Sequence, residues 1–233
     1  MEGNFLCLPN SVAFPVGVKE NLSVNTIPSK LLKRKFHMEI GLIVKYLREN
    51  RRKRPDEGAE FRPNKGAIFF GPSGTGKSWA AMAVLVDELK LAEKTGRTVV
   101  YFDAVSKYAF VFGKHRCVRI EALQGPNSTD IPELAEQENL LIYDASAGNT
   151  QELSIFCCEY FIFLSPNAGN YKQAARSGLL TFICPNWTKE ELKELEHGYG
   201  DRYTPWEVES HFDRYGGYPR VVVFSDTRLQ LIN

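Results

Sequence analysis

The stretch Gly71-Pro72-Ser73-Gly74-Thr75-Gly76-Lys77-Ser78 matches the pattern of a glycine, four free positions and then Gly-Lys-Ser. The apolar run at residues 66–70 before it is typical of a buried strand, and residues 78–90 after it are rich in residues that favour a helix. Strand, glycine-rich loop and helix are the context that this motif requires. The stretch therefore predicts a phosphate-binding loop inside a fold that alternates strands with helices.

The chemistry of this loop follows from its backbone. Glycines at positions 71, 74 and 76 permit dihedral angles that other residues avoid, so successive N–H groups can point at one anion. The helix that begins there adds the positive end of its dipole. We expect Lys77 to reach the β- and γ-phosphates and the Ser78 hydroxyl to hold Mg²⁺. The predicted ligand is a nucleoside triphosphate, ATP with Mg²⁺, held by all eight residues of the loop.

Length and composition indicate an ordinary globular protein. The 233 residues suit one large domain or a domain with an extension, with 43% hydrophobic and 24% charged residues. A net charge of +1 gives no general basic field and hence no composition-level argument for nucleic acid. The five cysteines include no C-x-x-C pair, which favours a reducing compartment. Neither a membrane span nor a secretory signal is recognisable, so we expect an intracellular protein, nuclear or cytoplasmic.

A second chemical element is the apolar strand predicted at residues 139–144, which ends in Asp144. A carboxylate at the end of a buried strand is the Walker B pattern, and Asp144 would ligate or support Mg²⁺ beside the loop. The next residue is Ala145, where many ATPases place a glutamate that activates water. Asp103 ends the strand predicted at residues 98–103, and two interpretations stay open for it: a general base, or a strand-terminal turn residue. We therefore expect slow hydrolysis.

Another buried strand is predicted at residues 159–164, with polar residues at its tip. Ser165 and Asn167 lie where ATPases with an additional strand place a γ-phosphate sensor, but Ser-Pro-Asn is also favourable turn chemistry, so both interpretations remain open. The other expected elements are a hairpin at residues 108–120, a short helix at 131–137 capped by Asp130, strands at 179–184 and 221–224, and helices after Thr188 and Thr204. This alternation predicts a mostly parallel sheet covered on both faces.

The N-terminal part is expected to be an irregular arm followed by a helix at residues 30–50. Apolar residues recur there at helical spacing, and the polar face is expected to carry Lys33, Arg34, Lys35, Lys45 and Arg48. The helix runs into the basic sequence Arg51-Arg52-Lys53-Arg54. This run is either a solvated helix end whose cations the helix dipole favours, or a nuclear-import signal or contact to a nucleic-acid backbone.

An ordered set of motifs resembles the P-loop region of Crinkler-type and retrotransposon-hot-spot (RHS) proteins: GPSGTGKS, LLIYDASAG, FIFLSPNAGNYK, TFICPNWTKEEL and YGGYPRVVVF. The resemblance covers roughly residues 30–227. That family's ATPase belongs with additional-strand NTPases of the AAA and STAND kind. The resemblance implies a three-layer α/β P-loop NTPase with a mostly parallel sheet and a small helical lid. It further implies that residues 217–220 form the lid turn and that Arg220 senses or clamps the nucleotide phosphates.

Crinkler proteins are effectors of filamentous microbes, many of which act in host nuclei, so the resemblance implies a host or nuclear protein partner. We expect three parts: an arm, amphipathic helix and basic linker at 1–62, an NTPase core at 63–185, and a helical lid with a final strand at 186–233. The expected function is Mg-dependent ATP binding with slow hydrolysis, as a nucleotide-dependent switch. The alternatives are a binding module with little turnover and a small-molecule or nucleoside kinase, in which Asp103 would be the acidic base.

Overall fold

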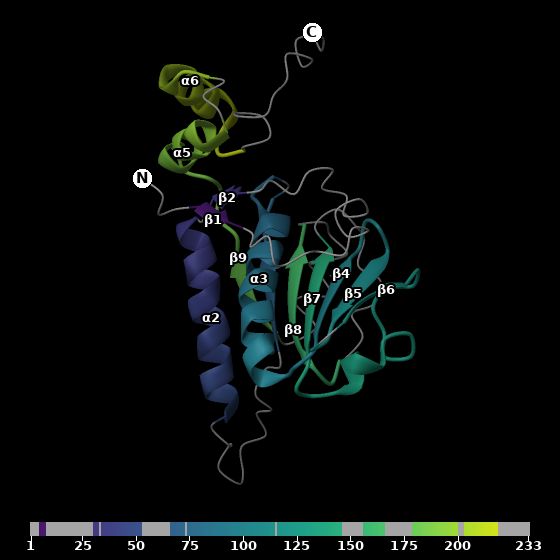
Figure 1. Ribbon diagram of the computed structural model, residues 1–233. Coiled ribbons are helices and arrows are strands. Elements are labelled where there is room, and N and C mark those ends of the chain that lie inside the picture. Colours follow the sequence, from purple (N-terminus) through teal and green to yellow (C-terminus); the bar gives the residue numbers. More distant parts are fainter. Residues whose placement is uncertain are drawn as a thin grey trace.

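The computed structural model describes residues 5–7, 30–32, 34–52, 66–72, 74–114, 116–145, 156–165, 179–199 and 203–218. In these ranges a sheet of seven strands has the order β6-β5-β4-β7-β8-β3-β9 (Figure 1). The strands are β3 (Gly66–Phe70), β4 (Val99–Asp103), β5 (Tyr108–Phe112), β6 (Cys117–Glu121), β7 (Leu140–Ala145), β8 (Glu159–Leu164) and β9 (Leu180–Ile183). The helices are α2 (Lys35–Arg52), α3 (Lys77–Thr95), α5 (Lys189–Tyr199) and α6 (Pro205–Tyr215), with a 3-10 turn η1 (Pro132–Ala135).

The order and direction of the strands identify the fold. β3, β4, β7, β8 and β9 run parallel, and β5 with β6 adds an antiparallel hairpin at one edge. β8 lies between β3, which leads into the glycine-rich loop, and β7, which carries Asp144 near its end. This inserted strand is the one after which the additional-strand class is named. The chain therefore has the α/β P-loop NTPase fold that the sequence and the family resemblance predict.

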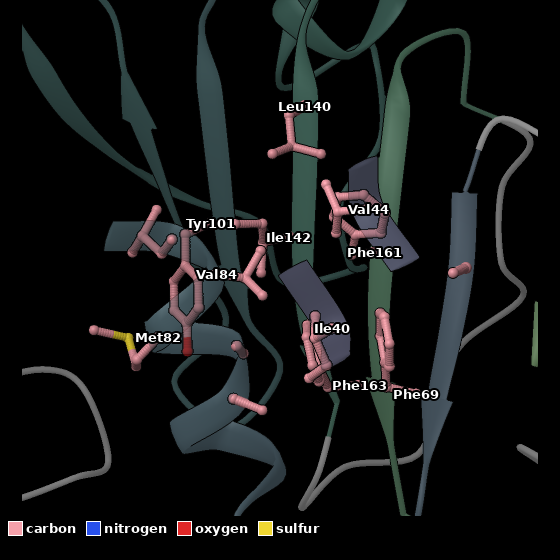
Figure 2. Packing of buried hydrophobic residues seen from close by; sticks show 14 of the residues in the cluster. Ile40, Val44, Phe69, Met82, Val84, Tyr101, Leu140, Ile142, Phe161 and Phe163 are labelled. Carbon is pink, nitrogen blue, oxygen red and sulfur yellow. The ribbon is translucent and has the colours of Figure 1, made fainter. Parts of the chain in front are cut away.

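The central strands of the sheet are buried on both faces and carry apolar residues on both sides. One face packs against α3 and against α2, which lies beside α3 (Figure 1). Figure 2 shows Ile40 and Val44 of α2 in this cluster, close to Phe161 and Phe163 of β8. The other face packs against residues from connecting segments and η1, namely Ala104, Ala122, Ile131, Leu134, Phe156 and Cys158.

Two short helices form the lid at the end of the sheet where the glycine-rich loop lies (Figure 1). α5 and α6 pack on each other through a small apolar cluster of Trp187, Leu192, Leu195 and Val208. The hydroxyl of Thr204 accepts a hydrogen bond from Glu207 N, and the Glu207 carboxylate accepts one from Thr204 N, which makes a complete capping box for α6. Both helices begin where the sequence predicts them.

The N-terminal part differs from the prediction in two respects. Residues 30–32 are not helical: they form strand β2 (Lys30–Leu32), which pairs antiparallel with β1 (Phe5–Cys7), and α2 begins at Lys35. Arg34 and Arg48 do not lie on a solvated face. Arg34 is 2% exposed, and the partly buried Arg48 bonds to acidic residues of other elements. Periodicity alone could not separate the strand from the helix, because apolar positions continue through both.

Arg48 belongs to a network of two cations and two anions that joins α2, α3 and the start of β8. Arg48 bonds to Glu88 at 2.7 Å and to Glu159 at 3.2 Å, and Arg97 bonds to Glu159 at 3.0 Å. Burial opposes the charge on Arg48, but the bonds to Glu88 and Glu159 outweigh it and raise its pKa. The four charges balance, so the network can lie at the border of the core.

The short helix expected at residues 131–137 is the 3-10 turn η1, and Asp130 does not cap it. Ile131 holds the N-cap position, and the Asp130 carboxylate instead accepts a bond from the Asn127 amide at 2.7 Å. The strand expected at residues 221–224 lies outside the described residues. None of the helices in the described ranges combines the length and apolar character that crossing a bilayer needs.

Candidate functional site

The glycine-rich loop joins the end of β3 to the start of α3, as the motif requires. Gly74 and Gly76 have φ values of 84° and 87°, in the left-handed region that favours glycine. Gly76 is the N-cap of α3, no side chain caps it, and no acidic residue lies in the first turn of the helix. The first N–H groups of α3 thus have no side-chain acceptor at the cap, and the helix dipole favours an anion there.

The segment that follows β9 packs closely against the glycine-rich loop. A Cβ atom added to Gly71 would lie 2.8 Å from Cys184 Cβ, and one added to Gly76 would lie 3.4 Å from Trp187 Cζ2. Cys184 and Trp187 are both buried. The loop therefore has a fixed shape that depends on small residues at these two positions.

Lys77 lies inside this loop and is 3% exposed. Its Nζ donates to Pro72 O at 2.7 Å, and the Thr75 hydroxyl donates to the same carbonyl at 2.9 Å. Burial lowers the pKa of Lys77, while the Coulombic effects of Cys184 and Asp144 act in the opposite direction. The two residues predicted to handle the phosphates and the metal, Lys77 and Asp144, are therefore within electrostatic reach of each other.

Two carboxylates lie side by side at the ends of neighbouring strands. Asp103 of β4 pairs in register with Asp144 of β7, and both are buried. Tyr101 donates its hydroxyl to Asp144 Oδ2 at 3.3 Å, and burial, Asp144 and Asp103 together raise the pKa of Tyr101 well above its usual value. Asp103 Oδ1 accepts from Val105 N at 3.0 Å, whereas its buried Oδ2 has no hydrogen-bond partner in the described part of the chain.

The structure describes some of the remaining predicted site residues but not all of them. Ser78 lies in the first turn of α3, and Ser165 directly follows β8, between the ends of β3 and β7. Ser73, Asn167 and Arg220 lie outside the described residues, as do Lys53 and Arg54 of the basic run. The roles proposed for these residues, and both interpretations of the basic run, stay predictions.

The residues present fit a magnesium ion that is bound together with a nucleotide. No group of three or more His, Cys, Asp or Glu side chains in the described ranges is arranged to hold a metal alone. Magnesium bound with nucleotides takes only one or two ligands from carboxylates and completes its shell with phosphate oxygens and water. A hydroxyl at the start of α3 and a carboxylate at the end of β7 are the protein ligands that this arrangement needs.

Sequence reasoning missed one residue of this site. Arg34, expected on the polar face of a helix, is buried beneath the loop and donates from Nη1 to Thr75 O at 2.9 Å. Nothing in the local sequence distinguishes Arg34 from the exposed Lys35 beside it. Its burial depends on acceptors that come from distant parts of the chain.

The comparisons with known proteins give a limited likeness. No family model matches the sequence. No curated protein matches it. Among solved structures, the chain is similar to the Aeropyrum pernix ORC1 protein, solved in complex with DNA, with a TM-score of 0.46 and 14% identity. The match covers 80% of this chain and 56% of that one, so this chain spans little more than half the length of that protein. The fold follows from the strand order itself.

Proposed function

We propose that this protein binds ATP with Mg²⁺ at the loop of residues 71–78 and works as a slow ATPase. The proposal rests mainly on one observation, the uncapped start of α3 behind a glycine-rich loop that encloses the buried Lys77. In this proposal the backbone N–H groups and Lys77 hold the phosphates, and Ser78 and Asp144 hold the metal. When bound, Mg²⁺ would neutralise charge on the β- and γ-phosphates.

Slow turnover follows from the residues around Asp144. Ala145 has no group that can orient water, and its side chain is buried in the cluster on the opposite face of the sheet. The buried Oδ2 of Asp103, which has no hydrogen-bond partner among the described residues, is the proposed proton acceptor beside the carboxylate of Asp144. Arg220 is proposed as the lid residue that senses the phosphates. We expect a rate well below about 10 s⁻¹, the median for enzymes.

The finer proposal is a nucleotide-dependent switch of the Crinkler or RHS kind. The motifs that carry this resemblance include the loop, the Asp144 strand and the β8 tip, and a lid with two packed helices suits a switch that reports the γ-phosphate. A nuclear or host protein partner, and a role for the basic run in import or nucleic-acid contact, belong to this finer proposal.

An ATP titration with and without Mg²⁺ tests the site, with Lys77→Ala as the variant. The substitution removes a charge-assisted contact worth about 1.5–3 kcal/mol, so ATP affinity should fall by roughly tenfold to a hundredfold. Lys90→Ala on the exposed side of α3 is the matched control and should bind ATP normally. If folded Lys77→Ala protein binds ATP as tightly as the parent does, the phosphate-loop assignment is wrong.

Asp103→Asn separates the catalytic alternatives. If Asp103 is the base, the variant should bind ATP with unchanged affinity and lose its phosphate release, measured in a coupled assay. Brisk hydrolysis that survives the substitution would exclude Asp103 as the base. The kinase alternative predicts that phosphate transfer requires a second substrate, so ADP would form from ATP only when candidate nucleosides or small alcohols are added.

A further inference from the structure

The buried guanidinium of Arg34 joins three parts of the site. Besides Thr75 O in the phosphate loop, it donates from Nη2 to Asn186 O at 3.0 Å, in the connection between β9 and α5. It also forms a two-pronged ion pair with Glu191 of α5, with Nε–Oε1 at 3.1 Å and Nη2–Oε2 at 2.9 Å. One side chain therefore holds the loop, the connection and the first turn of the lid together.

The buried environment of Arg34 makes its contacts with the loop and the lid sensitive to any movement of α5. Its side chain is 1% exposed, and the guanidinium carbon lies 4.3 Å from the centre of the Trp187 ring. Glu191 also accepts from Thr188 N at 3.0 Å, so the same carboxylate organises the start of α5. A buried cation that loses its anion is strongly destabilised. If α5 moved away from the loop, Arg34 would lose its counter-ion, and its bond to Thr75 would have to change as well.

A second set of contacts, through Trp187 and the turn after α6, also joins the lid to the phosphate loop. Trp187 N donates to Gly217 O at 3.2 Å, which ties the turn after α6 to the segment that Arg34 stacks on. A Cβ atom on Gly217 would lie 2.1 Å from Trp187 O, so this approach is tight. The next residue, Tyr218, places its ring 3.6 Å from the position of a Cβ atom on Gly74. The lid thus contacts the loop from the Arg34 side and from the Tyr218 side.

We propose that Arg34 is a positioning residue that couples the lid to the phosphate loop, with Glu191 as its partner. The proposal rests on the nucleotide binding proposed above. A bound triphosphate favours one shape of the loop, and the Thr75 carbonyl transmits that shape through Arg34 to α5. Coupling of this kind is reciprocal, so a lid held by Arg34 also favours nucleotide binding.

The test combines ATP affinity with amide hydrogen exchange in the full chain. In the parent, saturating ATP should slow exchange in residues 71–78 and also in α5. Arg34→Lys keeps the charge but cannot make the two-pronged bond. Glu191→Gln removes the anion. In each variant ATP should still protect the loop while the protection of α5 disappears, and affinity should fall about tenfold, within the usual range of allosteric coupling. The double variant should lose little more than either single one.

Asp213→Asn is the matched control, because it removes the exposed bond of Lys189 to Asp213 at 2.9 Å between α5 and α6 and leaves Arg34 alone. It should retain ATP-dependent protection of α5. General destabilisation would speed exchange across the sheet as well and would not remove the response of α5 selectively. If the parent binds ATP and both variants keep the α5 response, the coupling is refuted while the ATP site stands. If the parent does not bind ATP, the proposed function itself fails. Should Arg34→Lys not fold, Glu191→Gln decides, because glutamine keeps a hydrogen-bond acceptor for Arg34 at this partly exposed position of the lid.

Discussion

A series of three glycine-to-alanine substitutions would test whether the loop is a binding site or only a tight turn. Gly76→Ala places a Cβ atom on a residue with φ of 87°, and a left-handed conformation costs an L-residue about 1–2 kcal/mol. The new atom would also come into contact with Trp187 at 3.4 Å. We expect a loss of about 2 kcal/mol in the free energy of unfolding. For a chain of this length that lowers Tm by about 4–8 °C.

Two other glycines provide the controls. Gly96 ends α3 with φ of 75°, and a Cβ atom added to it would have nothing within 4 Å, so Gly96→Ala carries the backbone cost of about 1–2 kcal/mol without the contact. Gly41 lies within α2 with equally open surroundings and helical backbone. Gly41→Ala should therefore stabilise the protein by about 0.5–1 kcal/mol.

The assay measures urea unfolding by circular dichroism without nucleotide, and then ATP affinity under native conditions. Gly76→Ala and Gly96→Ala should lose similar stability, but only Gly76→Ala should lose ATP affinity, by about tenfold or more, because it alone distorts the start of α3 that faces the phosphates. Equal ATP affinity in the two variants would refute the argument that the backbone at Gly76 forms the phosphate site. A destabilised Gly41→Ala variant would refute the placement of α2.

Two further predictions concern the interior. Glu159→Gln leaves Arg48 and Arg97 with one anion between them and should lower the free energy of unfolding in urea by about 2–3 kcal/mol, somewhat less than the loss of a fully buried pair. The control Glu49→Gln, at an exposed ion pair, should change it by less than about 0.5 kcal/mol. Equal effects of the two substitutions would contradict the role of Glu159 in this ion-pair network. Burial raises the pKa of the Cys184 thiol to about 12, so iodoacetamide at pH 8 should alkylate it only after unfolding, as followed by mass spectrometry of the peptide. Because the pKa of Cys184 is raised in the folded state, the contribution of this thiol to the free energy of unfolding should be full below pH ~8.5 and should decline at higher pH. Rapid alkylation of the folded protein would show that the thiol is accessible.

The parts of the fold that sequence predicts well are those with local signals. The loop of residues 71–78 defines its own strand and helix, and the apolar runs of β4, β7 and β8 are continuous because both faces of these strands are buried. Lid helix α6 is indicated by Thr204 followed by proline. The position of Asp144 near the loop follows from the same logic, since parallel strands end at one edge of the sheet.

What sequence could not predict depends on contacts between distant residues. Arg34 is buried because acceptors from the loop and the lid surround it, and no neighbouring position records this. The pairing of Asp103 with Asp144 in register, and the lack of a partner for Asp103 Oδ2 among the described residues, likewise arise only when β4 and β7 meet. The insertion of β8 beside β3 was predicted through the family resemblance and not through any pattern within the strand.

The place of β3 in the sheet has a consequence for how the chain folds. Its two neighbours, β8 and β9, both come much later in the sequence, whereas β4, β5, β6 and β7 pair with one another in an unbroken series, to which β8 is added beside β7. During synthesis the strand that leads into the glycine-rich loop therefore stays apolar and unpaired until the ribosome has released β8, which ends at Leu164, and one of its edges stays open until β9 follows. Such distant pairing slows folding and leaves an edge open to association with other chains. Fragments that end after β7 should accordingly aggregate, although they contain both the loop and Asp144.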